Sequence, residues 1–86
     1  MDDVELMRKL LTELAHGRYS HALWEQAAVN HYPDGALESL RREFVRWVLE
    51  LQGPPPFRAI NWAEHAVTVQ AYLARLNALP VLGATS

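Results

Sequence analysis

The fold is decided by residues 36–52, whose sequence is ALESLRREFVRWVLELQ. Large apolar side chains recur in this stretch at spacings of three and four, which is the period of one face of an α-helix. They form a single stripe over four turns, at positions 37, 40, 44, 47, 48 and 51, and positions 45 and 49 widen it. Asp34 precedes the stretch as a helix cap, and Gly53 follows it as a stop. The stretch therefore predicts a long amphipathic helix.

Two helices are predicted before this one. Residues 2–15 carry leucine, valine and methionine at helical spacing, and Gly17 follows as a stop signal. Residues 20–31 begin with Ser20, a favourable cap, and are rich in alanine, the best helix former. A short hairpin over 19–32 is the alternative for this second segment. Its Glu-Gln-Ala-Ala run is poor strand material, so the helix is the preferred interpretation.

A fourth helix is predicted over 62–78, after a proline-rich connector over 53–60. Asn61 and Glu64 have the spacing of a capping box, with Asn61 as the cap and Glu64 reaching back to it. Three consecutive prolines cannot continue a helix, and they are interpreted mainly as a stiff spacer that sets an interhelical angle. We expect the tail over 80–86 to fray. The whole chain is therefore predicted to be one all-α domain, either a small four-helix bundle or an orthogonal helical array.

Composition excludes several classes of protein. Of the 86 residues, 50% are hydrophobic and 21% are charged, which is too apolar for a disordered chain. There is no cysteine, so a disulfide scaffold, a zinc finger and a thiol nucleophile are excluded. The net charge of −2 makes nucleic-acid binding an unfavoured interpretation. No apolar run reaches the roughly 20 residues of a membrane helix, and the acidic start lacks the basic flank of a signal peptide. We therefore expect a soluble, cytoplasmic protein without a membrane partner.

The sequence contains no catalytic constellation that we assign, and we predict no catalytic residue, no metal ligand and no cofactor. His21 and Glu25 stand four residues apart on the second predicted helix, so they share a face, but a metal site needs a third ligand nearby. The four glycines are isolated from one another and form no phosphate-binding loop. The three serines lack the context of a nucleophile elbow.

A small set of residues is predicted to contact a protein partner. Tryptophan is enriched in binding hot spots, and three arginines form the only basic cluster. The set is Trp24, Arg41, Arg42, Arg46, Trp47 and Phe57. Structural interpretations stand beside this one. The tryptophans can be packed in the core and stabilise it. The arginines can form a solvated helix face whose charge is neutralised by neighbouring glutamates.

The predicted function is a small non-enzymatic protein-interaction module, either an accessory subunit or a regulator, that is also a homodimer. The second predicted helix offers little apolar cover, so one side of the bundle is expected to expose an apolar surface near Trp24. Symmetric pairing is the commonest way to bury such a surface. The alternative is a carrier of a small ligand, with a pocket between the helices. Its expected lining is Trp24, Tyr32, Trp47 and Tyr72.

Short stretches resemble two helical families. Arg18-Tyr19, Pro33, Leu37-Glu38-Ser39 and Arg42-Glu43 resemble part of the theta subunit of bacterial replicative polymerase. Arg46-Trp47 and Ala71-Tyr72 are similar in placement to residues of acyl-CoA-binding proteins. Each resemblance lacks a characteristic segment of its family, so we assign the chain to neither.

Overall fold

The structure is a computed structural model, and it describes residues 3–56 and 59–79. Four α-helices, a π-helical turn and a 3₁₀ turn make up most of this part of the chain. The helices are α1 (Asp3–Ala15), α2 (His21–Trp24), α3 (Gly35–Gln52) and α4 (Ala66–Asn77), and the turns are η1 (Glu25–Val29) and η2 (Trp62–His65). The described residues contain no strand, so the all-α prediction is confirmed and the hairpin over 19–32 is wrong.

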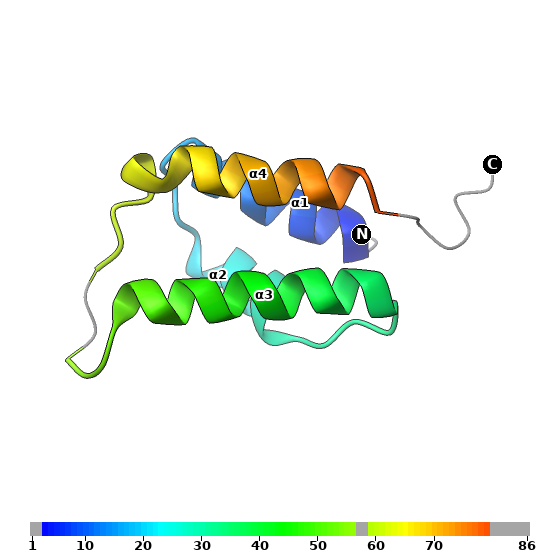
Figure 1. Ribbon diagram of the computed structural model, residues 1–86, viewed down its shortest axis with the longest axis horizontal. Coiled ribbons are helices and arrows are strands. Elements are labelled where there is room, and N and C mark those ends of the chain that lie inside the picture. Colours follow the sequence, from blue (N-terminus) through cyan, green and yellow to red (C-terminus); the bar gives the residue numbers. More distant parts are fainter. Residues whose placement is uncertain (1–2, 57–58, 80–86) are drawn as a thin grey trace.

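The three longer helices lie roughly along the long axis of the molecule (Figure 1). Helices α1 and α4 lie side by side and run in opposite directions, and α4 is also antiparallel to α3. The short α2 and η1 pack against α1 and lead the chain across to the start of α3. Within the described residues, no helix combines the length and the apolar character that crossing a lipid bilayer requires.

Helix α1 ends at a glycine in a Schellman motif. The Arg18 N–H donates to the Glu13 carbonyl, and the Gly17 N–H donates to the Leu14 carbonyl, both at 2.9 Å. Gly17 has a φ of 76°, which glycine adopts without a steric penalty. A Cβ on Gly17 would lie 3.5 Å from the Cβ of Ala63, which is an ordinary contact distance, so the positive φ rather than the available space favours glycine here. The predicted stop is confirmed.

The second predicted helix forms, but it is shorter and less regular than residues 20–31. Ser20 caps it as predicted, with its hydroxyl accepting the Leu23 N–H at 3.3 Å. After Trp24 the backbone widens into the π-helical turn η1. The helix then ends at Val29 rather than at residue 31.

Side chains satisfy the backbone carbonyls at the end of η1. The Asn30 amide donates to the carbonyls of the first two residues of η1, each at 3.3 Å. The Tyr32 hydroxyl donates to the Ala27 carbonyl, and the Arg41 guanidinium donates to the Ala28 carbonyl at 2.6 Å. Helix ends leave such carbonyls without intrahelical partners, and buried ones require substitutes. These bonds explain why the helix stops here although its sequence favours continuation.

Helix α3 begins and ends as predicted. The Asp34 carboxylate accepts the Leu37 N–H at 2.9 Å, which makes Asp34 the N-cap. At the other end, Gly53 has a φ of 72° and a ψ of −170°. This combination is essentially restricted to glycine. The local sequence therefore fixes both ends of the longest helix.

The start of the last helix differs from the prediction. Residues 62–65 form the 3₁₀ turn η2, and α4 follows from Ala66 to Asn77. The Asn61 side chain makes no capping hydrogen bond, so the predicted capping box is wrong. Its backbone carbonyl instead accepts the Glu64 N–H at 3.1 Å. A 3₁₀ turn bonds each carbonyl to the third residue onward, and here this tighter pattern supplies the start of the helix.

One cluster of buried side chains fills the space between the helices. Phe44 is fully buried within it. Its ring centroid lies between 5.4 and 6.5 Å from those of Trp24, Trp47, Trp62 and Tyr72. Aromatic pairs at such distances add to the stabilisation that burial alone provides. Phe44 is therefore the residue on which α2, α3, η2 and α4 converge.

The predicted apolar stripes are mostly buried. The buried members on the four predicted helices are Met7, Leu10, Leu11, Leu14, Ala27, Ala28, Leu37, Leu40, Phe44, Val48, Trp62, Val69 and Leu76. Leu49, which was expected to widen the stripe of α3, is instead 55% exposed. Trp47 is only partly buried, although it packs against the core cluster. The predicted tail over 80–86 lies outside the described residues.

Candidate binding pocket

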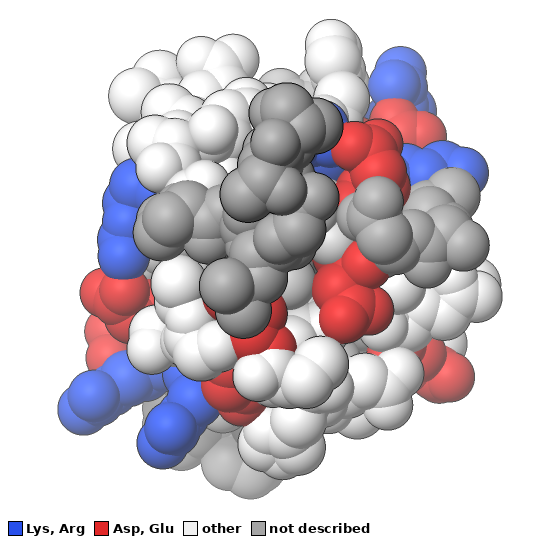
Figure 2. Space-filling view, turned by 90° about the vertical axis from the view of Figure 1, so that its right-hand side faces the viewer, with Lys and Arg blue, Asp and Glu red and all other residues white. Residues whose placement is uncertain are grey.

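The predicted basic cluster does not form one surface. Arg42 and Arg46 are exposed on α3, and Arg46 Nε lies 3.8 Å from a carboxylate oxygen of Glu50. Arg41 is only 6% exposed, so its guanidinium is not available to a partner. At the end of the molecule drawn in Figure 2, acidic and basic side chains are interspersed rather than segregated by sign. The arginine cluster is therefore divided between a structural residue and two solvated ones.

Arg41 and Glu38 form a buried clamp between α3 and the chain that follows η1. Arg41 Nε and Nη2 donate to the two carboxylate oxygens of Glu38 at 2.8 and 2.7 Å. This is the strong bidentate geometry of an arginine–carboxylate pair. The same carboxylate accepts the Tyr32 N–H at 2.9 Å and lies 2.8 Å from the His31 ring. The hydrogen bonds from Arg41 hold the pKa of Glu38 well below its usual range, and burial raises the pKa of Tyr32 to about 12.

The low pKa of Glu38 predicts a loss of stability in acid. A carboxylate whose folded pKa lies below its unfolded value of about 4.3 stabilises the fold above that value, and the contribution is lost as the pH falls through the folded pKa. We expect the free energy of unfolding to fall less steeply between pH 6 and pH 2.5 in Glu38→Gln than in the wild type. Urea unfolding followed by circular dichroism measures both slopes, with Glu64→Gln at an exposed position as the control. Equal slopes in the wild type and Glu38→Gln would contradict the clamp.

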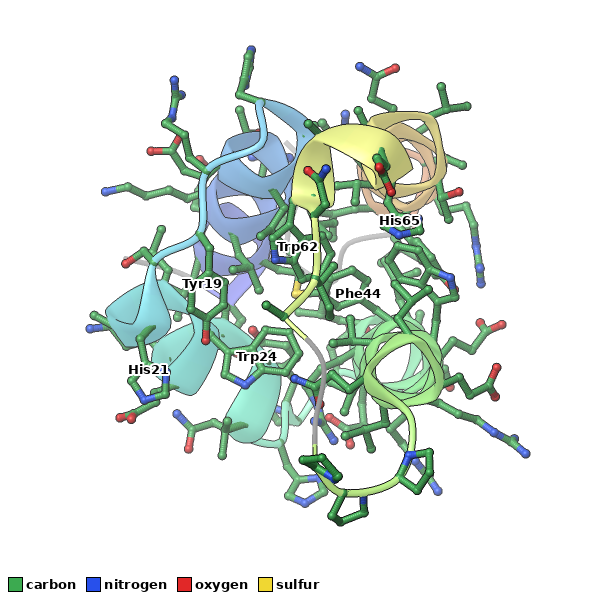
Figure 3. All side chains as sticks on the ribbon, turned by 90° about the vertical axis from the view of Figure 1, so that its left-hand side faces the viewer. Tyr19, His21, Trp24, Phe44, Trp62 and His65 are labelled. Carbon is green, nitrogen blue, oxygen red and sulfur yellow. The ribbon has the colours of Figure 1, made fainter. Side chains whose placement is uncertain are left out.

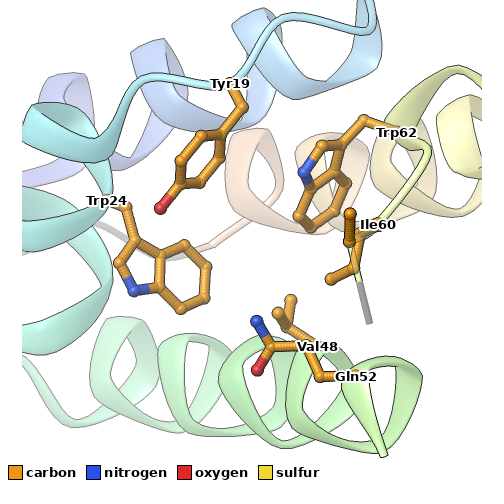
Figure 4. Close-up of a pocket in the computed structure, with 7 residues that line it drawn as sticks. Tyr19, Trp24, Val48, Gln52, Ile60 and Trp62 are labelled. Carbon is orange, nitrogen blue, oxygen red and sulfur yellow. The ribbon is translucent and has the colours of Figure 1, made fainter. Parts of the chain in front are cut away.

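An open cavity of about 330 Å³ lies between the end of α2, the second half of α3 and the chain that leads into η2 (Figure 4). The lining residues are Tyr19, Trp24, Val48, Gln52, Ala59, Ile60 and Trp62. Aromatic rings and aliphatic groups form most of the wall, and Gln52 contributes an amide. None of these residues carries a charge. The volume is at the lower end of the roughly 300–1,000 Å³ that ligand pockets occupy.

The core positions the walls of the cavity. Trp24 is the last residue of α2, and Trp62 is the first residue of η2. The buried Phe44 ring lies 6.1 Å from the Trp24 ring and 6.5 Å from the Trp62 ring, and it therefore supports both indoles from behind (Figure 3). Val48 and Gln52 follow one another by a single turn on α3 and complete the wall below. Both indoles therefore serve the core and the cavity together.

A hydrogen-bonded chain of three side chains lies at the rim of the cavity. The Tyr19 hydroxyl lies 3.0 Å from His21 Nδ1, and His21 Nε2 lies 2.6 Å from a Glu25 carboxylate oxygen. Burial raises the pKa of Tyr19 above its ordinary value. The predicted pairing of His21 with Glu25 is therefore present. Of the three side chains, Tyr19 lines the cavity, whereas His21 and Glu25 are largely exposed.

Only one of the four residues that we expected to line a small-ligand pocket lines the observed cavity. Trp24 lines the observed cavity, but Tyr32, Trp47 and Tyr72 do not. Tyr32 is buried, with its hydroxyl bonded to the Ala27 carbonyl. Trp47 and Tyr72 instead contact each other, at a centroid distance of 5.6 Å. Their spacing on the helices does not reveal this division, because it depends on how α3 and α4 cross.

Trp47 and Phe57 are the two other aromatic residues that were predicted to contact a partner. Trp47 is partly buried, and its ring packs at 6.1 Å from Trp62 and at 5.7 Å from His65. Phe57 lies outside the described residues. Sequence reasoning missed Tyr19 and Ile60 as lining residues, because both stand in connecting segments without periodicity. Of the predicted contact residues that the structure describes, Trp24 is the one that lines the cavity.

Other kinds of site are not evident in residues 3–56 and 59–79. No group of three or more His, Cys, Asp or Glu side chains in these ranges is placed to hold a metal ion. A second hollow, of about 280 Å³, lies on the outer face of α1 between charged side chains. Its walls come from one helix and are mostly charged, so it offers little apolar contact. The cavity at Trp24 and Trp62 is therefore the better candidate.

Comparison with known proteins gives no guide to the cavity. No protein-family model, no curated protein and no solved structure matches this chain. The function is therefore inferred from the residues of the cavity themselves.

Proposed function

We propose that this chain is a small non-enzymatic protein-interaction module that takes an apolar side chain of its partner into the cavity at Trp24 and Trp62. The observation that carries this proposal is the cavity itself, with its open mouth and its wall of uncharged, largely aromatic residues. Tryptophan and tyrosine dominate the residues that supply binding energy in protein interfaces. The cavity also lies beside the short α2, on the side where the sequence provides least apolar cover.

The size of the cavity favours a side chain of a protein over an enclosed ligand. A volume of about 330 Å³ is at the bottom of the range for drug-sized molecules. It accommodates one or two large apolar side chains, while the rest of the partner lies over the rim. Tyr19, which is 50% exposed, is the rim residue available for that wider contact. A central anchor with a surrounding rim is the usual anatomy of a protein interface.

The partner in this proposal is a second copy of the chain or a larger protein. A second copy offers exposed aliphatic side chains of its own. Val29 and Leu49 are 56% and 55% exposed, respectively, and are the candidates for an anchor. If one of them enters the cavity of another copy, the mass in solution rises to about twice 9.8 kDa.

Two matched substitutions test the proposal. Ile60→Glu places a carboxylate in the wall of the cavity, whereas Val67→Glu makes the same kind of change at an exposed site outside it. Peptides selected by phage display against the wild-type protein provide the ligands, and fluorescence anisotropy measures their affinity. We expect Ile60→Glu to weaken binding at least tenfold, because an apolar side chain would desolvate an unpaired charge. Val67→Glu should change binding less than twofold.

Light scattering at micromolar concentration shows whether the partner is a second copy. A dimer that Ile60→Glu converts to a monomer identifies self-association through the cavity. Equal effects of the two substitutions on peptide binding and on mass would contradict the proposal.

The second candidate function is a carrier of a small ligand. In this case the ligand would occupy the observed cavity and not the pocket that was expected from the sequence. Native mass spectrometry of the purified protein distinguishes it. A retained small molecule that is lost in Ile60→Glu would support the carrier, and a bare chain that binds the selected peptides would support the interaction module.

A further inference from the structure

A hydrogen-bond donor without a protein partner faces the cavity. Trp62 is only 6% exposed, yet no hydrogen bond within the described residues reaches its indole N–H. Its nitrogen is not sealed in the core either, because the described side chains include no fully buried polar atom that lacks a partner. Figure 4 shows the indole nitrogen facing Tyr19 across the cavity. The cavity is therefore the side from which a ligand reaches this donor.

The other polar groups of the cavity define what the donor can recognise. Gln52 extends its amide toward the cavity from α3, and this amide also has no partner among the described residues. The Tyr19 hydroxyl is already engaged with His21 at the rim. None of the lining residues within 3–56 and 59–79 carries a charge, so these residues offer no counter-ion to a carboxylate or an ammonium group. A neutral hydrogen-bond acceptor next to an apolar group matches these properties.

We infer that the cavity recognises a neutral peptide segment in which a large apolar side chain enters the cavity and an adjacent backbone carbonyl accepts the Trp62 indole N–H. This inference rests on the proposed function and specifies the chemistry of the partner. In a peptide, each side-chain-bearing Cα is bonded directly to a carbonyl carbon, so anchor and acceptor are always close together. Trp62 is the first residue of η2, and its indole nitrogen faces into the cavity.

Occupation of the cavity would remove the Trp62 N–H from water, and this makes the donor a determinant of binding. A polar group that loses water on binding must gain a new hydrogen bond, or binding is weakened. An apolar side chain that fills the cavity displaces water from the Trp62 N–H. A ligand without an acceptor therefore leaves this donor unsatisfied, whereas a peptide carbonyl replaces the lost water.

Nuclear magnetic resonance detects the indole N–H of Trp62 directly in the wild-type protein. The chain has three tryptophans, so it gives three indole N–H signals, which tryptophan-to-phenylalanine variants assign. The probes are N-acetyl-phenylalaninamide, a neutral blocked amino acid, and ethylbenzene, which has a similar apolar group and no acceptor. We expect the amide to move the Trp62 signal downfield and to slow its exchange with water. The Trp47 signal, outside the cavity, should stay in place, and ethylbenzene should cause no downfield shift.

Two matched variants test the same hydrogen bond by its effect on binding affinity. Trp62→Phe removes the N–H but keeps an aromatic wall, and Trp47→Phe makes the same change at a ring that does not line the cavity. We expect Trp62→Phe to weaken binding of the amide relative to ethylbenzene by roughly threefold to tenfold, the range of one neutral hydrogen bond. Trp47→Phe should leave this ratio unchanged. Because the quantity is a ratio, a general change in the shape of the cavity cancels.

The outcomes separate this inference from the proposed function. If the amide moves the Trp24 signal but neither the Trp62 signal nor the affinity ratio responds, the carbonyl contact is wrong and the interaction module stands. If the Trp62 signal responds but Ile60→Glu leaves the selected peptides bound, the donor site is supported and the interaction module is wrong. If neither probe enters the cavity and Ile60→Glu has no effect, both are overturned.

Discussion

Replacing Arg41 with alanine is expected to lower the free energy of unfolding by about 3–5 kcal/mol, the usual effect of removing one partner from a buried ion pair. The side chain of Arg41 is 7% exposed and that of Glu38 is 17% exposed, so the carboxylate left behind has little access to water. The substitution also removes the donor to the Ala28 carbonyl, which ends η1. Equilibrium unfolding in urea measures the loss.

The neighbouring arginine provides the control. Arg42→Ala alters the same residue type at an exposed position, and we expect a change within about 0.5 kcal/mol. Arg41→Lys should recover little of the stability, because a single ammonium group cannot bond two carboxylate oxygens and the Ala28 carbonyl in the geometry of a guanidinium. A loss below about 1 kcal/mol in Arg41→Ala would contradict the buried ion pair, and Arg41 would again be interpreted as a residue that contacts a partner.

Replacing Phe44 with alanine is expected to lower the free energy of unfolding by about 3–5 kcal/mol, as deletion of a buried aromatic ring does. Phe44 has no exposed surface, and four aromatic rings surround it. Natural domains are stable by only about 5–15 kcal/mol, so a large part of the variant population is expected to be unfolded at 37 °C. Thermal unfolding followed by circular dichroism measures this effect.

A conservative variant and an exposed leucine show whether the ring is the cause. Phe44→Leu retains most of the apolar volume, and it should lose less stability than Phe44→Ala. Leu49→Ala lies on the same helix at a side chain that is 55% exposed, and it should cost less than about 1 kcal/mol. Similar losses in Phe44→Ala and Leu49→Ala would contradict the placement of Phe44 at the centre of the core.

The same residues build the core and the proposed binding cavity. Trp24 and Trp62 each pack one face toward Phe44 and also line the cavity. Alanine at either position would therefore change stability and binding together. For this reason, Ile60→Glu and Trp62→Phe are better tests of binding than deletion of an indole.

Local sequence determined where most elements begin and end. Ser20 and Asp34 cap their helices, and Gly17 and Gly53 end theirs, because these effects involve backbone groups only a few residues away. The stripe of residues 36–52 predicted the longest helix, since apolar periodicity is visible without knowledge of any partner element. Where a tighter turn competed with a side-chain cap, at Asn61, the same local reasoning was wrong.

The candidate site required the tertiary structure. In the sequence, Arg41 is one member of a basic cluster, yet in the structure it is buried. Glu38 and a carbonyl of η1 thirteen residues earlier in the chain satisfy its guanidinium together. Tyr19, Trp24 and Trp62 meet only because α1, α2 and η2 pack around Phe44. The sequence thus determined the helices and their caps through short-range hydrogen bonds and periodicity. Only long-range packing decided which polar groups would be satisfied inside the fold and which, like the Trp62 N–H, would face a cavity.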